Sequence, residues 1–141
     1  MKLDLSSLEH ALASLDESLT AVDNQPWFDA QPSVVQNTLI AGVIQNFEFV
    51  YELSIKMMRR RIETDAATPS EADFANFRDL LRTAVEKGLI ADPTAWFEYR
   101  AMRNITAHTE DHQKALSVYA GTHRFIGDAQ ALFQELTARN A

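Results

Sequence analysis

Apolar residues recur at helical spacing along almost the whole of this 141-residue sequence. Between Leu5 and Val22 they follow one another at alternating steps of three and four, which is typical of an amphipathic helix. Ser6 and Glu9 have the spacing of a capping box at its start. The run Asp-Asn-Gln-Pro at 23–26 predicts its end, and residues 27–32 then form a short connection.

The next segment predicts a long helix that starts at Ser33, a suitable cap, and runs to about Glu63. About 30 residues of helix span roughly 45 Å, so this helix should run the full height of the molecule. Its apolar stripe is broad, which favours a central helix contacted from several sides. The stripe consists of Leu39, Val43, Phe47, Val50, Ser54 and Met58, flanked by Ile40, Ile44, Tyr51 and Ile55.

Charged residues interrupt this stripe and follow it. Glu48, Glu52 and Lys56 stand four residues apart, so they form either an exposed ladder or a half-buried polar network that holds a neighbouring helix. The run 59–61 is Arg-Arg-Arg and closes the helix. We interpret these arginines as complements of the helix dipole, with an RNA-contacting patch as the alternative.

Three more helices are predicted downstream. Thr68-Pro69-Ser70-Glu71 is a capping box with proline in the first turn, and Gly88 stops the helix that it begins. Asp92-Pro93 starts a fourth helix in the same way. Thr109 is the predicted cap of a fifth, with Glu110 and Asp111 in its first turn. The apolar side of that last helix comprises Leu116, Tyr119, Ile126, Phe133 and Leu136, while Gly121 and Gly127 allow a bend or a close crossing.

No strand pattern, internal repeat or low-complexity segment is visible. We therefore predict an all-α fold, an up-and-down four-helix bundle with a fifth helix, in one domain over residues 1–141. The chain has no cysteine, which excludes disulfides and thiolate metal sites. No apolar run approaches the length of a membrane span and no signal peptide is apparent, so we expect a cytoplasmic protein without membrane contact.

The net charge of −7 gives no general attraction to nucleic acid, so any RNA contact has to be local. The densest polar chemistry lies at Arg103, Asn104 and His108. On a helix these side chains, with Arg100, fall within an arc of roughly 140°. Arginine offers a planar fork for phosphate, and histidine exchanges protons near neutral pH. The segment is therefore either a solvated helix face or a site for phosphoryl-transfer chemistry.

Other chemistries lack a sequence signal. There is no glycine-rich phosphate loop and no nucleophile elbow, and we predict no cofactor. His108 and His112 are four residues apart, but the helix start expected at Thr109 separates them, so no metal site is predicted. The aromatic residues have core spacing and are assigned to packing. Trp27, in the connection, is the exception and marks either a bundle cap or a contact surface.

The segment Gly42–Leu53, followed by Lys56, resembles the second-helix signature of the nucleotidyltransferase substrate-binding family, a branch of the HEPN (higher eukaryotes and prokaryotes nucleotide-binding) domains. Gly88-Leu89-Ile90, Asp92 and Trp96 resemble the next part of the family pattern. Arg103-Asn104 and His108-Thr109 complete it in the same order, so the likeness covers nearly the whole chain.

This resemblance implies a helical bundle that forms homodimers and brings two arginine–histidine motifs together. Many HEPN domains are metal-independent endoribonucleases and toxins, and this branch is typically paired with a minimal nucleotidyltransferase that acts as antitoxin. Carried over by position, Arg103 and His108 are the catalytic pair and Asn104 supports them. Arg100, Glu48 and Glu52 are auxiliary candidates.

One position departs from the family pattern. Many members have a tyrosine two residues after the histidine, and the partner modifies it with AMP, whereas this chain has Glu110. Two functions therefore stay open. The chain is either an RNA-cleaving toxin subunit or a non-catalytic subunit that helps the nucleotidyltransferase to hold its substrate. The retained motif favours the first function, and the acidic charge with Glu110 favours the second.

Overall fold

The computed structural model describes residues 2–140, and this part of the chain is helical with no strand. The predicted all-α fold is confirmed. The α-helices of the described residues are α1 (Ser6–Asp23), α2 (Gln25–Asp29), α3 (Ser33–Asp65), α4 (Phe77–Glu86), α5 (Pro93–Ile105) and α6 (His112–Arg139), with 3₁₀ turns at Pro69–Ala72 and Thr106–His108.

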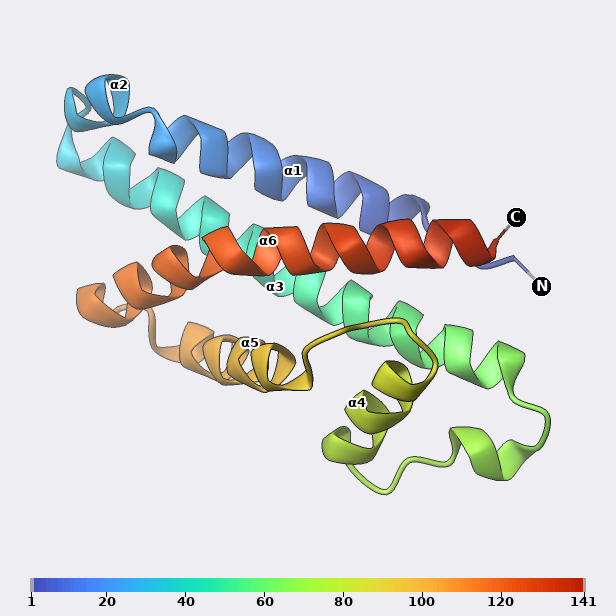
Figure 1. Ribbon diagram of the computed structural model, residues 1–141. Helices are drawn as coiled ribbons and strands as arrows, with labels where there is room; N and C mark the ends of the chain where they lie inside the picture. The colour runs from blue at the N-terminus through green and yellow to red at the C-terminus, as the bar shows by residue number, and fades with distance from the viewer. Residues whose placement is uncertain (1, 141) are drawn as a thin grey trace.

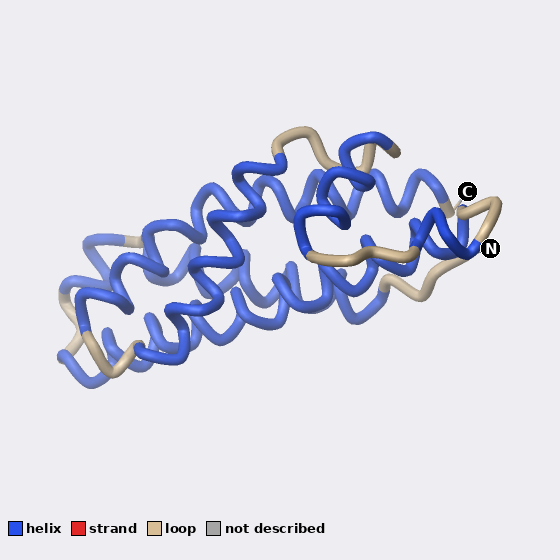
Figure 2. Tube along the Cα trace, turned by 90° about the horizontal axis from the view of Figure 1, so that it is seen from below, coloured by secondary structure: helices blue, strands red, loops and turns tan. Residues whose placement is uncertain are grey.

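Four of these helices form the predicted up-and-down bundle. Helices α1, α3, α5 and α6 run alternately in opposite directions, and α4 lies beside α3 and α5 as the additional helix (Figure 1). The connection between α5 and α6 is short, whereas the one between α3 and α5 contains α4. The described part of the chain begins and ends at the same end of the bundle (Figure 2). Within residues 2–140 no helix is both long and apolar enough to cross a membrane.

Helix α1 buries the predicted leucine–valine stripe against α3 and α6. The capping box at Ser6 does not form. Helix α1 has Leu5 at its cap position without a side-chain bond, and Ser6 already lies in the first turn. The Asp4 carboxylate accepts hydrogen bonds from the Ser6 amide and hydroxyl instead. Asp4, two positions before Ser6, thus supplies the side-chain acceptor at the helix start that the capping-box pattern assigned to Ser6.

The long helix α3 is confirmed, and it extends two residues beyond the predicted end, but Ser33 is its first residue and not its cap, which is Pro32. The dipole interpretation of the arginine run is wrong, because α3 continues to Asp65 and its last turn contains no basic residue. Arg61 has a different role. Its side chain is buried and donates bonds to Asp65 at 2.8 and 3.1 Å and to Asn140 at 3.2 Å. Asn140 in turn exchanges two hydrogen bonds with the Leu3 backbone. Arg61 therefore ties the end of α3 to both ends of the described chain.

Two predicted boundaries are wrong. The connection over residues 27–32 begins inside the short helix α2, and the third helix starts at Phe77 rather than near Thr68. Residues 69–72 form only a 3₁₀ turn, with the Glu71 carboxylate bonded to the Ala67 amide. Asn76 is the true cap, because its side chain accepts a bond from the Asp79 amide at 2.9 Å. Two start signals compete here, and only the second continues into an apolar face that can pack.

Both predicted signals around α5 are confirmed. Gly88 adopts a φ of +76°, a left-handed conformation that suits glycine at the end of a helix. The Asp92 carboxylate accepts a hydrogen bond from the Ala95 amide at 3.3 Å and so caps α5 ahead of Pro93.

The start and the buried face of α6 differ from the prediction. Asp111, not Thr109, is the cap, and its carboxylate accepts bonds from the Gln113 and Lys114 amides. Of the predicted apolar side only Leu136 is fully buried. Small residues let α6 approach its neighbours along an adjacent stripe, which consists of Ala115, Val118, Thr122, Phe125, Ala129, Leu132 and Leu136.

An aromatic cluster joins α3, α5 and α6. Phe125 of α6 meets Phe47 of α3 edge to face at 4.8 Å between ring centroids, and it meets Tyr99 of α5 at 4.9 Å. Trp96 lies 5.3 Å from Tyr99 in the same geometry. All four rings are almost completely buried, and the Tyr99 hydroxyl donates to Asp128. Such ring pairs favour one relative placement of the helices.

The glycines of α6 differ in their surroundings. A Cβ placed on Gly121 would lie 2.7 Å from Sδ of Met102, whereas a Cβ on Gly127 meets no atom within 4 Å. The predicted close crossing is confirmed at Gly121, where α6 passes α5, and is wrong for Gly127.

We expect Gly127→Ala to raise the free energy of unfolding by about 0.5–1 kcal/mol, because alanine loses less backbone entropy in a helix. Gly121→Ala should raise the free energy of unfolding by less or should lower it, since the new methyl group has to displace the Met102 side chain. Urea denaturation of both variants measures the difference. An equal gain in the two variants would contradict the close crossing.

His123 links α6 to the end of α1. Its Nε2 lies 2.9 and 3.0 Å from the two carboxylate oxygens of Asp23, and its Nδ1 lies 3.2 Å from the Ala120 carbonyl oxygen. A neutral imidazole has one N–H, so only the protonated ring donates to both acceptors. The Tyr119 hydroxyl also donates to Asp23.

The bond to Asp23 raises the pKa of His123 above 6.5. Burial works against ionisation of Asp23, but bonds from Tyr119 and His123 outweigh it and lower the pKa of that carboxyl.

The raised pKa of His123 predicts a pH-dependent stability. The contribution of His123 should be fully present below pH 6.5, its unfolded value, and should fade as the pH rises through the higher folded pKa. We expect His123→Gln to destabilise the protein more at about pH 5.5 than at about pH 9, as measured by urea denaturation. In an Asp23→Asn background this pH dependence should disappear. A destabilisation that grows with pH would contradict the link.

Candidate functional site

Arg103 lies near the end of α5, on the side that faces α3. The buried residues Trp96 and Tyr99 precede Arg103 by seven and four positions, so they lie on the same side of α5. At the end of this buried side the guanidinium reaches Glu52 of α3. The Arg103 side chain is one-third exposed, with a fractional exposure of 33%. Arg103 is thus accessible to a ligand while its stem rests on the bundle.

Three groups hold the Arg103 guanidinium. Its Nε and one terminal nitrogen donate to the same oxygen of Glu52 at 3.0 and 2.8 Å, and the other terminal nitrogen donates to the Thr106 hydroxyl at 2.9 Å. A carboxylate oxygen of Glu48 lies 3.8 Å away. The prediction of a polar network that holds a neighbouring helix is confirmed for Glu48 and Glu52, but only Glu48 is half-buried, since the Glu52 side chain is 53% exposed. Lys56 is exposed and makes no ion pair with another described residue.

The electrostatic effect of these contacts is to keep Arg103 charged. The hydrogen bond to Glu52 raises the pKa of the guanidinium above its ordinary value, and burial opposes this only in part. Burial also raises the pKa of the neighbouring Tyr51 to about 12, although the charges of Arg100 and Arg103 oppose that shift. Tyr51 is therefore a neutral phenol at physiological pH, and it lies within electrostatic reach of both arginines.

His108 lies in the 3₁₀ turn Thr106–His108, so the continuous helix predicted for 103–108 is wrong at its end. The Thr106 hydroxyl accepts from Arg103 and donates to the Arg103 carbonyl oxygen at 2.6 Å, a bond that competes with continuation of the α-helix. Asn104 and His108 are exposed, and their side chains make no hydrogen bond within residues 2–140. Thr106 therefore couples the arginine to the turn that presents the histidine.

Arg100 precedes Arg103 by one turn of α5. Its guanidinium carbon lies 4.7 Å from the ring centroid of Phe77 in α4, within the range of a cation–π contact. The side chain is exposed and has no carboxylate partner in the described part of the chain. Arg100 thus contacts α4 through Phe77, and it also lies next to Arg103 on α5.

The comparison with known proteins decides the family. A family model described as "Nucleotidyltransferase substrate binding protein like" matches residues 3–138. This chain belongs to the nucleotidyltransferase substrate-binding family. The match extends over almost every described residue, so the family resemblance of the sequence motifs is confirmed.

Two relatives from Haemophilus influenzae are similar over nearly their full length. A protein named "Probable ribonuclease HepT" is 48% identical over 139 residues, which are 99% of this chain and 95% of that protein. A solved structure, described as the fold of a substrate-binding domain of a nucleotidyltransferase, superposes with a TM-score of 0.92 at 46% identity. It covers 95% of this chain, and 99% of that structure is matched.

Relative to the family pattern, Glu110 has an unexpected position. It lies in the turn between the 3₁₀ segment and the Asp111 cap, so the predicted place in the first turn of α6 is wrong. Glu110 instead lines a groove of about 310 Å³ between this turn and α3. The groove is formed by Asn37, Ile40, Ala41, Ile44, Thr109, Glu110, His112 and Ala115. Glu110 therefore contributes its charge to a surface near His108 rather than to a helix dipole.

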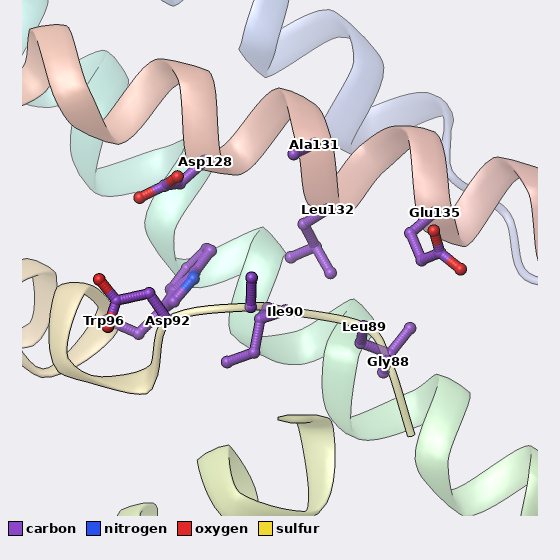
Figure 3. Close-up of a pocket in the computed structure, with 10 residues that line it drawn as sticks. Gly88, Leu89, Ile90, Asp92, Trp96, Asp128, Ala131, Leu132 and Glu135 are labelled. Carbon is purple, nitrogen blue, oxygen red and sulfur yellow. The ribbon is translucent and has the colours of Figure 1, made fainter. Parts of the chain in front are cut away.

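A separate cavity of about 390 Å³ lies between the 88–92 connection and α6 (Figure 3). The carboxylates of Asp92, Asp128 and Glu135 surround its apolar floor of Leu89, Ile90, Trp96 and Leu132. Arg124 pairs with Asp92 and Arg139 pairs with Glu135, and the lining itself contains no basic residue, so this cavity does not suit an anionic substrate. Within residues 2–140 no group of three His, Cys, Asp or Glu side chains is placed to hold a metal ion.

Sequence analysis missed two features of the site. Thr106 was not a candidate, although a hydroxyl three residues after an arginine on a helix is a signal for such a bond. The second feature is the exposure of aromatic rings that were assigned to packing. Phe49 is 49% exposed and Phe97 is 36% exposed. Trp27, the exception to that assignment, lies in α2 and is 43% exposed. Only the interhelical angles decide which ring of a helix turns outward.

Proposed function

We propose that this protein is a metal-independent endoribonuclease of the HEPN type, the toxin of a pair with a minimal nucleotidyltransferase. The observation that carries the proposal is the arrangement of Arg103. Glu52 and Thr106 fix its guanidinium, and two of its five N–H groups remain for a ligand. The same Thr106 begins the turn that exposes His108. The name of the similar HepT protein supports this choice of reaction.

In the proposed reaction a ribose 2′-oxygen attacks the adjacent phosphorus, and the bond from phosphorus to the 5′-oxygen breaks. His108 takes the proton of the 2′-hydroxyl as general base or supplies the proton of the leaving 5′-oxygen as general acid. Arg103 donates to the phosphate oxygens and stabilises the charge that develops on them. Asn104 adds a neutral donor on the same helix. Glu48 and Glu52 act as positioning residues because they hold Arg103.

The proposed assembly is a homodimer in which two such sites face one another, with the nucleotidyltransferase as an additional partner. The exposed side chain of His108 has little protection from water in one chain. A second chain would enclose the site and supply a second histidine, so that one histidine acts as base and the other as acid. The description of the family supports the nucleotidyltransferase as partner.

A second candidate function is that of a non-catalytic accessory subunit that helps the nucleotidyltransferase hold its substrate. The observation in its favour is the surplus of acid around Arg103, where Glu48 and Glu52 both offset its charge. Glu110 adds a further negative charge nearby. The description of the similar solved structure as a substrate-binding domain agrees with this alternative.

We expect His108→Ala to lower the rate of RNA cleavage by roughly 10²–10⁴-fold while the fold stays intact. Arg103→Lys should also be severely impaired, because an ammonium group cannot reproduce the planar fork. The products should be 2′,3′-cyclic phosphate and 5′-hydroxyl ends, and EDTA should not inhibit. Gel analysis of a labelled RNA with chemical mapping of the ends measures these outcomes, with circular dichroism as the folding check.

A matched control is His10→Ala, since His10 is an exposed histidine on α1. Equal cleavage by His108→Ala and His10→Ala would show that the activity comes from elsewhere. Absence of cleavage by the wild-type protein, with and without its partner, would favour the accessory function. A monomer in light scattering at micromolar concentration would exclude the site shared between two chains.

Glu110 gives a second test. We expect Glu110→Tyr to tighten RNA binding by up to about fivefold, because one charge at about 4 Å in water is equivalent to ~1 kcal/mol. The melting temperature should stay the same, since Glu110 precedes the cap of α6. The control is Glu17→Tyr, an exposed glutamate on α1. Fluorescence anisotropy measures the binding, and equal affinity of the wild type and Glu110→Tyr would rule out a dampening role for this carboxylate.

A further inference from the structure

Three arginines of α3, α4 and α5 each lie within cation–π distance of a phenylalanine ring. Arg78 lies 5.8 Å from the ring centroid of Phe97, Arg100 lies 4.7 Å from that of Phe77, and Arg59 lies 5.6 Å from that of Phe74. The Phe77 and Phe97 rings meet edge to face at 5.6 Å, which joins the first two pairs into one cluster. We call these six residues the Arg–Phe surface, and they come from α3, α4, α5 and the segment before α4.

The arginines of this surface lack the ion pairs that five other arginines form. Arg61, Arg82, Arg103, Arg124 and Arg139 all form ion pairs with carboxylates. The three arginines of the Arg–Phe surface have no carboxylate partner among residues 2–140. A ring holds the flat face of a guanidinium and leaves its N–H edge free. Their charges and donors are thus oriented yet uncompensated.

The distribution of charge along the chain agrees with this. Residues 56–103 contain nine of the 13 lysines and arginines but only eight of the 20 acidic residues. The excess of negative charge therefore lies outside the segment that forms the Arg–Phe surface. A net charge of −7 consequently does not exclude an anionic ligand here, because attraction at contact depends on the local charges.

A groove completes this surface. It has a volume of about 410 Å³ and lies between α4 and α5, with Arg78 and Arg82 at its edge and Phe97 and Pro93 among its apolar walls. Phe97 is 36% exposed, so part of its ring is accessible to a ligand in this groove. Glu86 also lines the groove, and Asp79 already pairs with Arg82 at 3.2 Å.

We propose that the Arg–Phe surface binds the single-stranded RNA that flanks the cleaved phosphate. Arg59, Arg78 and Arg100 would contact successive backbone phosphates, and a base would stack on Phe97. Arg100 stands one turn before Arg103 on α5, so it connects this surface to the cleavage site. Interleaved guanidinium groups and exposed rings are the combination that binds single strands without strict sequence preference. The inference rests on the proposed function, since it places the substrate of that reaction.

The test measures RNA binding without cleavage, in the His108→Ala background. We expect the double variant Arg59→Gln/Arg78→Gln to bind a fluorescein-labelled single-stranded RNA of mixed sequence more weakly in fluorescence anisotropy. The slope of log affinity against log salt, measured between about 50 and 200 mM, should become shallower by about 1.4, the value for two lost phosphate contacts on a single strand. Phe97→Ala should weaken binding about fivefold or more.

Matched variants separate the proposal from alternatives. Lys2→Gln/Arg124→Gln removes two exposed charges elsewhere and should keep the wild-type salt slope. Arg59→Lys/Arg78→Lys keeps the charges and should restore most of the slope. Equal binding by the two glutamine double variants would overturn the inference, even if the wild-type protein cleaves RNA. Binding to vesicles of anionic phospholipid but not to RNA would also overturn it. A loss of RNA binding in Arg59→Gln/Arg78→Gln would support it, even if no cleavage is found.

Discussion

The edge-to-face packing of Phe125 against Phe47 and Tyr99 is the contact on which the rest of the structure depends. These rings come from α6, α3 and α5, and they are fully removed from water. Because aromatic pairs have preferred angles as well as distances, they determine how α5 lies along α3. That placement brings Arg103 within hydrogen-bond distance of Glu52. The Arg103 side chain of the candidate site is thereby aligned by a core of aromatic rings that it does not belong to.

The protein orients its surface arginines by two different means. Glu52 and Thr106 hold Arg103 through hydrogen bonds, which give it a defined direction but offset part of its charge. Rings hold Arg78 and Arg100, and a ring leaves the charge in place. The first arrangement suits a group that has to meet one phosphate in one geometry. The second suits weaker contacts that have to accept different stretches of a flexible chain.

The predictions from sequence succeeded where one local signal decided the structure. Asp92 capped α5 and Gly88 ended its predecessor because each needs only its own backbone conformation and near neighbours. They failed where two local signals competed. The capping box at Thr68 and the asparagine at 76 both offer a helix start, and packing of the following face selects the second. The buried face of α6 was misplaced because apolar residues occur on two adjacent stripes of this helix, and only packing decides which stripe is buried.

The sequence by itself determined the helical class, the order of the long helices and the Arg103–His108 segment, since periodicity, caps and motif spacing are local properties. It left open whether Glu48 and Glu52 face solvent or a neighbouring helix. Only the tertiary structure decided that they hold Arg103, because the answer depends on the angle between α3 and α5. The same holds for the Arg–Phe surface. Its members are up to 41 positions apart, and their juxtaposition arises from the packing of α4 against α3 and α5.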